Sequence, residues 1–184
     1  MKKGIVIILI IVVLAVAGIY ILTTKHTTQP TSTVPQANDS SITIIGQQTK
    51  TSGCTASGGL EDKACTPGAI ISTASKDQIC VSGYSKSVRD VPTSEKDQVY
   101  QEYGIVSHAT GQYEVDHLIS LELGGSNDIA NLWPEAADPT PGFHQKDTVE
   151  NYLHSRVCNG SIPLAQAQQE IATDWLAVYN QIHP

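Results

Sequence analysis

The sequence contains few aromatic residues and few positive charges. Only 5% of its 184 residues are aromatic, Phe143 is the single phenylalanine, and 11 Lys and Arg stand against 18 Asp and Glu, for a net charge of −7. A protein that holds nucleic acid mainly through a basic surface is therefore not expected, because phosphate affinity comes largely from Lys and Arg. The negative balance does not exclude short-lived nucleic-acid chemistry at a metal ion. The length allows one ordinary domain with additional segments.

Pairs of the form Cys-x-x-Cys are also lacking, which argues against a zinc knuckle and against a thioredoxin-like site. The four cysteines are Cys54, Cys65, Cys80 and Cys158. An even number in an exported domain predicts two disulfides, for which three pairings are possible. We favour Cys54–Cys65, which closes a short loop rich in Gly and Ser, and Cys80–Cys158, which ties an early segment to a late helix. Four free thiols are the alternative for a cytoplasmic domain.

The N-terminus has the pattern of a membrane segment. Lys2 and Lys3 precede residues 4–22, an uncharged run that would reach roughly 28 Å as a helix, close to the thickness of a bilayer core. We expect residues 1–3 to be a cytoplasmic stub and residues 4–22 a single-pass anchor, with the following domain outside the cytoplasm, because the positive charges precede the run. The alternative is a cleaved signal segment and a secreted protein, since Ala15-Val16-Ala17 resembles a cleavage site.

Residues 23–50 are rich in Thr, Ser, Gln and Pro, a composition typical of a flexible linker. Within them, residues 42–45 are an apolar exception that could form a short strand. The folded domain is expected over residues 51–184, and its elements are predicted from periodicity, capping residues and turn signals. They are a strand at 78–81, a helix at 94–103, a strand at 113–119, a turn at 124–128, a strand at 129–133, a loop at 134–142, a helix at 143–157 and a last helix from Pro163 that packs through one apolar face.

One stretch of the chain concentrates the residue types that phosphate chemistry needs. Asp116 and His117 lie on a predicted strand, Asn131 lies on the return strand, and His144 opens a predicted helix. A divalent cation prefers carboxylate oxygen and can share an imidazole, so Asp116 and His144 are candidate metal ligands. A neutral His117 could be the general base that activates water, provided that the strand twists or bulges enough to bring both neighbours to one site. Asn131 could hold the backbone across the hairpin, and we assign Asn127 to the turn.

In order along the chain, Asp116-His117, Gly124-Gly125, Asn131-Leu132, His144 and Lys146 resemble the motif of the HNH endonucleases, the ββα-metal or His-Me finger family. The resemblance covers residues 113–157. It implies a nuclease that uses one divalent metal ion, Mg²⁺ or Mn²⁺ before Zn²⁺ or Ni²⁺, and nucleic acid, usually DNA, as a transient substrate. It also implies that His117 and Asn131 are the catalytic residues and that Asp116 and His144 hold the metal.

Lys146 and Arg89 are candidates to contact phosphate, which Arg can do with two parallel hydrogen bonds. For either residue alone, a surface ion pair is an equally good explanation. One feature departs from many HNH proteins, which brace the hairpin with zinc-binding Cys-x-x-Cys pairs. A Cys80–Cys158 disulfide could take their place here.

The predicted fold class is α+β, with a ββα-metal core, added strand and helix segments before it and a packing helix after it. The predicted function is an extracytoplasmic, metal-dependent endonuclease that contacts the membrane through its N-terminal helix, with no obligate protein partner. The acidic composition keeps open a non-catalytic binding module on the same scaffold. A metal-dependent hydrolase of another substrate is the third candidate.

Overall fold

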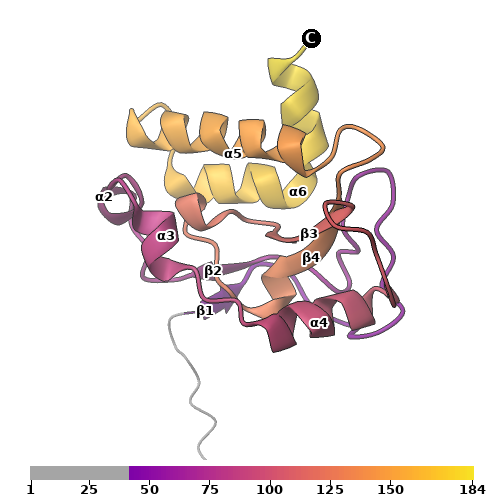
Figure 1. The fold of residues 1–184 in the computed structure, drawn as a ribbon. Coiled ribbons are helices and arrows are strands. Elements are labelled where there is room, and N and C mark those ends of the chain that lie inside the picture. The colour runs from indigo at the N-terminus through magenta and orange to yellow at the C-terminus, as the bar shows by residue number, and fades with distance from the viewer. Residues whose placement is uncertain (1–41) are drawn as a thin grey trace, which may run out of the picture. The chain divides into compact units, whose positions relative to one another are not determined.

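The centre of the fold is a two-stranded antiparallel hairpin of β3 (Tyr113–His117) and β4 (Leu132–Ala136), seen in a computed structural model that describes residues 42–184. Helices α5 (Phe143–Cys158) and α6 (Leu164–Ile182) lie side by side on one side of it, and α4 (Thr93–Glu102) lies on the other (Figure 1). The predicted α+β class is confirmed, since helices segregate around antiparallel strands.

The remaining elements are short and connect these layers. They are the strands β1 (Ile42–Ile44) and β2 (Ala69–Ile71), the helices α2 (Lys76–Ile79) and α3 (Tyr84–Val88), and the 3₁₀ turns η1 (Leu121–Leu123) and η2 (Ile129–Asn131).

The hairpin separates two hydrophobic clusters. Trp133 packs with Val149 of α5 and Trp175 of α6 in the larger cluster, whereas Leu132 packs with Val99 of α4 in the smaller one. Successive strand residues point to opposite faces, so the neighbours Leu132 and Trp133 enter different clusters. This burial on both faces fixes the register of β4 against β3, the strand that carries Asp116 and His117.

The expectation that a loop begins at Pro134 is wrong. Pro134 lies inside β4, opposite Val115 of β3. Proline is tolerated in an edge strand because its missing N–H can face away from the partner, and each strand of a two-stranded sheet is an edge. The longer strand carries Glu135 to within 4.0 Å of Lys146 on α5.

The chain turns at two glycines, as predicted. Gly124 has a φ of +75°, a backbone conformation that residues other than glycine rarely adopt. A Cβ on Gly125 would collide with the carbonyl oxygen of Ile119. Glycine therefore lets the segment after η1 pack directly against the backbone that follows β3.

The folded domain begins before residue 51. β1 pairs with β2 in antiparallel register, with Ile42 opposite Ile71. The backbone N–H groups of Thr49 and Lys50 donate to the carbonyl oxygen of Ala64 over 2.8 and 3.0 Å. Residues 42–50, which we expected to belong to the linker, are therefore part of the domain.

The strand predicted at residues 78–81 is wrong, because Lys76–Ile79 forms helix α2. The side-chain Oε1 of Gln78 accepts a hydrogen bond of 2.9 Å from the backbone N–H of Ser75, as in a capping box. Periodicity cannot separate a strand from one turn of helix in so short an apolar run.

The three longer predicted helices are confirmed as α4, α5 and α6. α4 begins after Pro92, so the Ser94 cap that we expected is not its N-cap. The apolar face predicted for the last helix is the face that packs, with Ala167, Ile171 and Trp175 buried. The helix bends at Asp174, whose φ of −167° and ψ of 89° are not helical.

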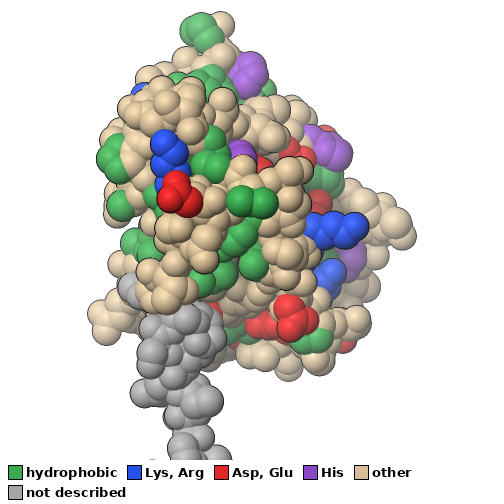
Figure 2. Space-filling model, turned by 90° about the vertical axis from the view of Figure 1, so that its left-hand side faces the viewer, with side chains coloured by type: hydrophobic (Ala, Val, Ile, Leu, Met, Phe, Trp, Pro, Cys, Tyr) green, Lys and Arg blue, Asp and Glu red, His purple; other side chains and the backbone are tan. Residues whose placement is uncertain are grey.

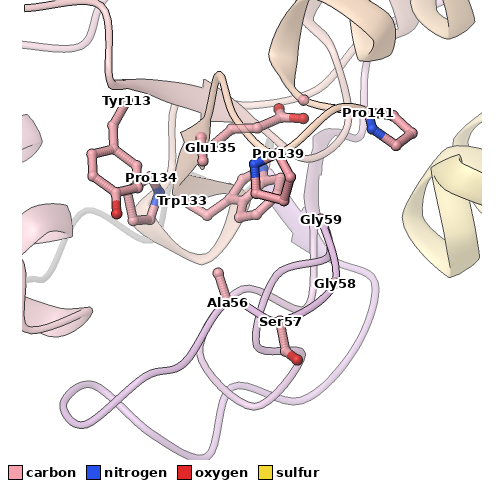
Figure 3. A pocket seen from close by; sticks show the side chains of 12 residues that line it. Ala56, Ser57, Gly58, Gly59, Tyr113, Trp133, Pro134, Glu135, Pro139 and Pro141 are labelled. Carbon is pink, nitrogen blue, oxygen red and sulfur yellow. The ribbon is translucent and has the colours of Figure 1, made fainter.

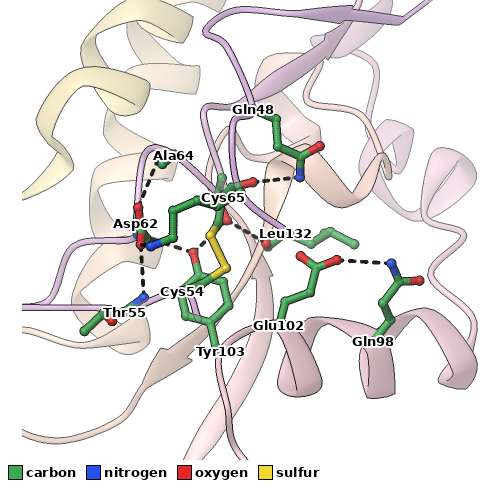
Figure 4. The surroundings of a disulfide bond; sticks show 12 residues. Gln48, Cys54, Thr55, Asp62, Ala64, Cys65, Gln98, Glu102, Tyr103 and Leu132 are labelled. Carbon is green, nitrogen blue, oxygen red and sulfur yellow. Dashed lines mark hydrogen bonds and ion pairs between the residues drawn. A yellow bond between two sulfur atoms is a disulfide. The ribbon is translucent and has the colours of Figure 1, made fainter. Parts of the chain in front are cut away.

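Both favoured disulfides, Cys54–Cys65 and Cys80–Cys158, are present. Figure 4 shows the first beside the side chain of Tyr103. The Tyr103 hydroxyl lies 2.7 Å from Thr66 Oγ1 and accepts the backbone N–H of Asp62 over 3.3 Å. The second disulfide ties the residue after α2 to the last residue of α5, and thereby joins the segment around α2 to the helix above the hairpin.

Among residues 42–184, no helix is long and apolar enough to span a bilayer. The expected stub at 1–3, the expected anchor at 4–22 and residues 23–41 of the expected linker lie outside the described residues. The two disulfides fit a domain that folds outside the reducing cytoplasm.

Candidate functional site

A polar cleft of about 190 Å³ opens where β3 ends against α5. Asp116 and His117, which are adjacent in the sequence, both line it. The strand stops at His117, so the strict alternation that would send the two side chains to opposite faces ends there. The other walls come from η1, from α5 and from Arg89, which follows α3.

His117 is buried, with 1% of its surface exposed, yet one ring nitrogen has no partner. Nε2 lies 3.1 Å from Asn127 Oδ1, whereas Nδ1 makes no hydrogen bond with any residue in the described part of the chain. Burial lowers the pKa of His117 to about 4, although the carboxylate of Asp116 acts in the opposite direction. The imidazole is therefore neutral at pH 7 and able to accept a proton.

Asp116 is held by a lysine from α5. The Nζ of Lys146 lies 2.7 Å from Asp116 Oδ2 and 2.7 Å from the carbonyl oxygen of His117, and it also contacts Glu150 Oε1. Burial alone would raise the pKa of Asp116, but the Lys146 charge lowers it below its usual value. The carboxylate is thus ionised and fixed at the edge of the cleft.

Lys146 itself is fully buried and not on the surface where we expected it to meet substrate. Its three acceptors use all three N–H groups of an ammonium. Although burial alone would lower the pKa of Lys146, the surrounding carboxylates hold it well above its usual value. The structure therefore gives Lys146 a place in the support of the site and leaves no donor free for a phosphate.

The neighbouring glutamates carry strongly raised pKa values. Burial raises the pKa of Glu135 to about 10, an effect that Lys146 opposes and Asp116 reinforces. Burial likewise raises the pKa of Glu150 to about 8, again against the charge of Lys146. Glu135 is therefore protonated at pH 7, which reduces the repulsion around Asp116.

Two carboxylates of α5, Asp147 and Glu150, line the cleft, whereas His144 of the same helix does not. His144 is exposed, its ring lies tilted against Phe143 with 4.3 Å between the ring centroids, and it does not line the cleft. The structure therefore does not place His144 beside Asp116 in the lining of the cleft, and the expected Asp116–His144 metal pair stays a prediction. Asp147 lines the cleft together with Asp116 and lies three residues after His144, on the same side of the helix. That spacing is the sequence signal that could have identified it.

The cleft is acidic beyond Asp116 and Asp147. Glu122 of η1 also lines it, and burial together with the Asp147 charge raises the pKa of Glu122. Burial and the Asp116 charge similarly raise the pKa of Asp147. Ser120 lies in the same wall, buried, with a hydroxyl that has no partner among the described residues. Oxygen atoms of this kind are the ligands that Mg²⁺ and Mn²⁺ prefer, and a cation would relieve their mutual repulsion.

Asn131 does not line the cleft but holds the backbone around it. Its Oδ1 accepts the N–H groups of Ile119 and Ala69 over 3.0 and 3.3 Å, and its Nδ2 donates to the carbonyl oxygens of Ile119 and Ser126 over 3.0 and 2.9 Å. These four hydrogen bonds join β2, the end of β3 and the glycine turn. The asparagine that contacts His117 is Asn127, for which the sequence pattern predicts only a place in the turn.

A second group of ligand-type atoms lies at the Cys80–Cys158 disulfide. The two sulfurs and a ring nitrogen of His154 lie within 4.8 Å of one another, a set that could hold a metal ion. The sulfurs are bonded to each other in this structure, so they could act as thiolate ligands only after reduction. His154 Nε2 instead lies 3.1 Å from the carbonyl oxygen of Ile79.

A further cavity of about 200 Å³ lies at the other end of the hairpin, between β4 and the loop of Ala56 to Gly59. Figure 3 shows Tyr113, Pro134 and Pro139 around it, while the carboxyl group of Glu135 points away from the loop. Its walls are mostly apolar, and we assign the polar cleft as the candidate site.

No protein-family model, curated protein or solved structure matches this chain. Its function must therefore be argued from the residues of the cleft, and the HNH resemblance stands as a hypothesis about them.

Proposed function

We propose that this chain is a metal-dependent phosphodiesterase of the HNH type, with nucleic acid as its first candidate substrate. One observation carries the proposal. The adjacent residues Asp116 and His117 open on the same cleft, one as an ionised carboxylate and the other as a neutral imidazole with an unpartnered nitrogen. An ionised carboxylate that can hold a metal ion, beside a neutral imidazole that can take a proton from water, suits the metal-assisted hydrolysis of a phosphodiester.

The donor set of the cleft fits one hard divalent cation, Mg²⁺ or Mn²⁺ before Zn²⁺ or Ni²⁺. Asp116 and Asp147 would hold it, since both line the cleft and both supply carboxylate oxygen. When bound, the ion would stabilise the negative charge that develops on phosphorus and on the leaving oxygen.

The protein residues have distinct roles in this proposal. His117 takes a proton from the attacking water, and its low pKa keeps it unprotonated before the reaction. Lys146 orients Asp116, and Asn131 holds the strand end that carries both residues. Arg89, exposed at the rim, contacts the phosphate oxygens of the substrate. The strand–strand–helix order of β3, β4 and α5 supports a ββα-metal core.

The charge of the cleft limits the substrate. Arg89 is the one Lys or Arg among its described lining residues. On the face drawn in Figure 2, the Lys and Arg side chains lie in small separate groups and form no continuous patch. We therefore expect weak, salt-sensitive binding of nucleic acid. The same observation favours a second candidate, the hydrolysis of a smaller phosphodiester, for which one arginine is sufficient.

The proposed location is outside the cytoplasm, on a membrane anchor at residues 4–22 or in secreted form if that segment is cleaved. The support comes from the charge pattern around that run and from the two disulfides of the described domain.

The test is hydrolysis by the full chain, purified in detergent micelles. Supercoiled plasmid, single-stranded DNA, RNA and bis(p-nitrophenyl) phosphate would each be incubated with Mg²⁺ or Mn²⁺. We expect His117→Ala and EDTA to abolish turnover, and His144→Ala to leave it within about twofold, because His144 lies outside the cleft. Turnover that survives both His117→Ala and EDTA would contradict the mechanism.

A further inference from the structure

The side chain of Asn127 points out of the glycine turn and lies between His117 and the Val88–Asp90 segment. Its Oδ1 lies 3.1 Å from His117 Nε2 and accepts the backbone N–H of Asp90 over 3.2 Å. Its Nδ2 donates to the carbonyl oxygen of Val88 over 2.8 Å. Asn127 therefore contacts the backbone on both sides of Arg89 as well as the imidazole of His117.

These contacts determine which way the amide of Asn127 points. The Val88 carbonyl oxygen can only accept, so it must face the NH₂ group, and the Asp90 N–H can only donate, so it must face the oxygen. The atom that faces His117 Nε2 is thus a carbonyl oxygen, which cannot donate. Nε2 must carry the proton of the neutral ring, and the lone pair lies on Nδ1, the nitrogen without a described partner.

The turn itself does not use the Asn127 side chain. Ser126 Oγ accepts the N–H of Asp128 over 3.3 Å, and Asp128 Oδ1 accepts the N–H of Ala130 over 2.9 Å. The flanking residues therefore provide the local hydrogen bonds that an asparagine in a turn commonly makes. This leaves the Asn127 amide for contacts with residues far from it in the sequence.

We infer that Asn127 is a positioning residue, which holds His117 in the tautomer with a free Nδ1 and ties that imidazole to the Val88–Asp90 segment that carries Arg89. The amide of Asn127 then fixes the position of His117, the proposed base, relative to Arg89, the proposed contact for phosphate. The catalytic meaning of this arrangement rests on the proposed function, whereas the tautomer is a property of the folded chain alone.

The experiment is a long-range ¹⁵N–¹H correlation spectrum of the histidines, recorded at pH 7 on the uniformly ¹⁵N-labelled full chain in micelles. The His117 signals are assigned by their loss in His117→Gln. We expect the wild type to show one tautomer with the proton on Nε2, and Asn127→Ala to show a mixture of both. Asn151→Ala is the matched control, because Asn151 lines the same cleft but donates to Asp147 O within its own helix.

A second variant distinguishes the loss of this hydrogen bond from a general misfolding of the chain. Asn127→Asp keeps an acceptor for His117 Nε2 but cannot donate to Val88, so it should retain the tautomer while Asn127→Ala loses it. If the wild type turns over a phosphodiester, Asn127→Ala should lower kcat about tenfold or more with a much smaller change in KM. A proton on Nδ1 in the wild type, or an unchanged tautomer in Asn127→Ala, would overturn the inference. Absence of turnover in the wild type would count against the proposed function alone, since the spectrum needs no substrate.

Discussion

The ammonium nitrogen of Lys146 lies 2.7 Å from the backbone carbonyl oxygen of His117. The same nitrogen binds Asp116 and Glu150, so a buried helix residue fixes the strand end that carries both candidate site residues. A buried cation that pairs with an ionised carboxylate such as Asp116 is expensive to disturb, because removal of one partner leaves the other charge without compensation. The support of the site can therefore be tested separately from its chemistry.

Replacement of this lysine should destabilise the fold. We expect Lys146→Met to lower the free energy of unfolding by about 3 kcal/mol, because the ionised Asp116 loses its cation in a buried position, and Glu150 and the carbonyl oxygen of His117 lose a hydrogen-bond donor. Urea denaturation followed by circular dichroism measures the change. Lys96→Met is the control, since Lys96 is exposed on α4, and it should change stability by less than about 0.5 kcal/mol. Equal stability of the two variants would show that the buried pair has no structural role.

Asn131 should be as important to the fold as to any activity. Asn131→Ala removes four hydrogen bonds and leaves buried backbone groups of Ile119 and Ala69 unpaired, so we expect a loss of about 3 kcal/mol or more. Asn180→Ala, at an exposed position of α6, is the comparison and should be close to neutral. A stable Asn131→Ala variant that merely lost activity would assign Asn131 to the chemistry instead of the backbone.

Metal binding should depend on Asp147 and not on His144. If Mn²⁺ binds the native cleft, a tenfold excess over its Kd should raise Tm by about 4 °C, and EDTA should reverse the shift. Asp147→Asn should abolish most of the rise because it removes a charged ligand, while His144→Ala should retain it. Differential scanning calorimetry of both variants, with and without Mn²⁺, measures the rise in Tm. The opposite pattern would restore His144 as the helix ligand.

The two disulfides should differ in their contribution to stability. Their cysteines are separated by 11 residues for Cys54–Cys65 and by 78 for Cys80–Cys158. Loop-closure entropy predicts about 3 kcal/mol for the shorter loop and about 4.5 kcal/mol for the longer one. Guanidinium denaturation of the paired Cys→Ser variants measures each value. A greater loss from the Cys54/Cys65 variant would indicate that packing around Tyr103, and not loop length, dominates.

Tyr103 should make the domain sensitive to alkaline pH. Burial raises its pKa to about 12, so the folded chain keeps the phenol protonated while the unfolded chain ionises near pH 10. The contribution of the protonated Tyr103 to the free energy of unfolding is therefore fully present below pH 10. It is lost as the pH rises towards 12, by about 2 kcal/mol in total. Chemical denaturation at pH 9 and at pH 11.5 should show this extra loss in the wild type. In Tyr103→Phe it should be absent, and its persistence there would assign the effect to other groups.

Local signals in the sequence located most of the elements around the site. Gly124-Gly125 predicted the turn, and the spacing of Val149, Leu153 and Val157 predicted α5. Elements without a local signal are predicted wrongly. Pro134 indicates a loop, although β4 continues through it to Ala136. The run at residues 78–81 is too short for its pattern to distinguish a strand from a helix. At the site, the sequence pointed to Asp116 and His117, and it gave no indication that Lys146 is buried or that Asn127 contacts His117.

By itself, the sequence determined the α+β class, the expectation of two disulfides from four cysteines, and the segment that contains the candidate site; which cysteines pair was decided by the structure. These features depend on periodicity, composition and spacing along the chain. The tertiary structure decided which side chains meet: Asp147 and not His144 lines the cleft with Asp116, Lys146 binds Asp116 from inside, and Asn127 contacts His117. The reason is that such contacts depend on helix phase, on the point where β3 ends and on the burial of charge between distant elements. Residue order along one chain does not encode those relations locally.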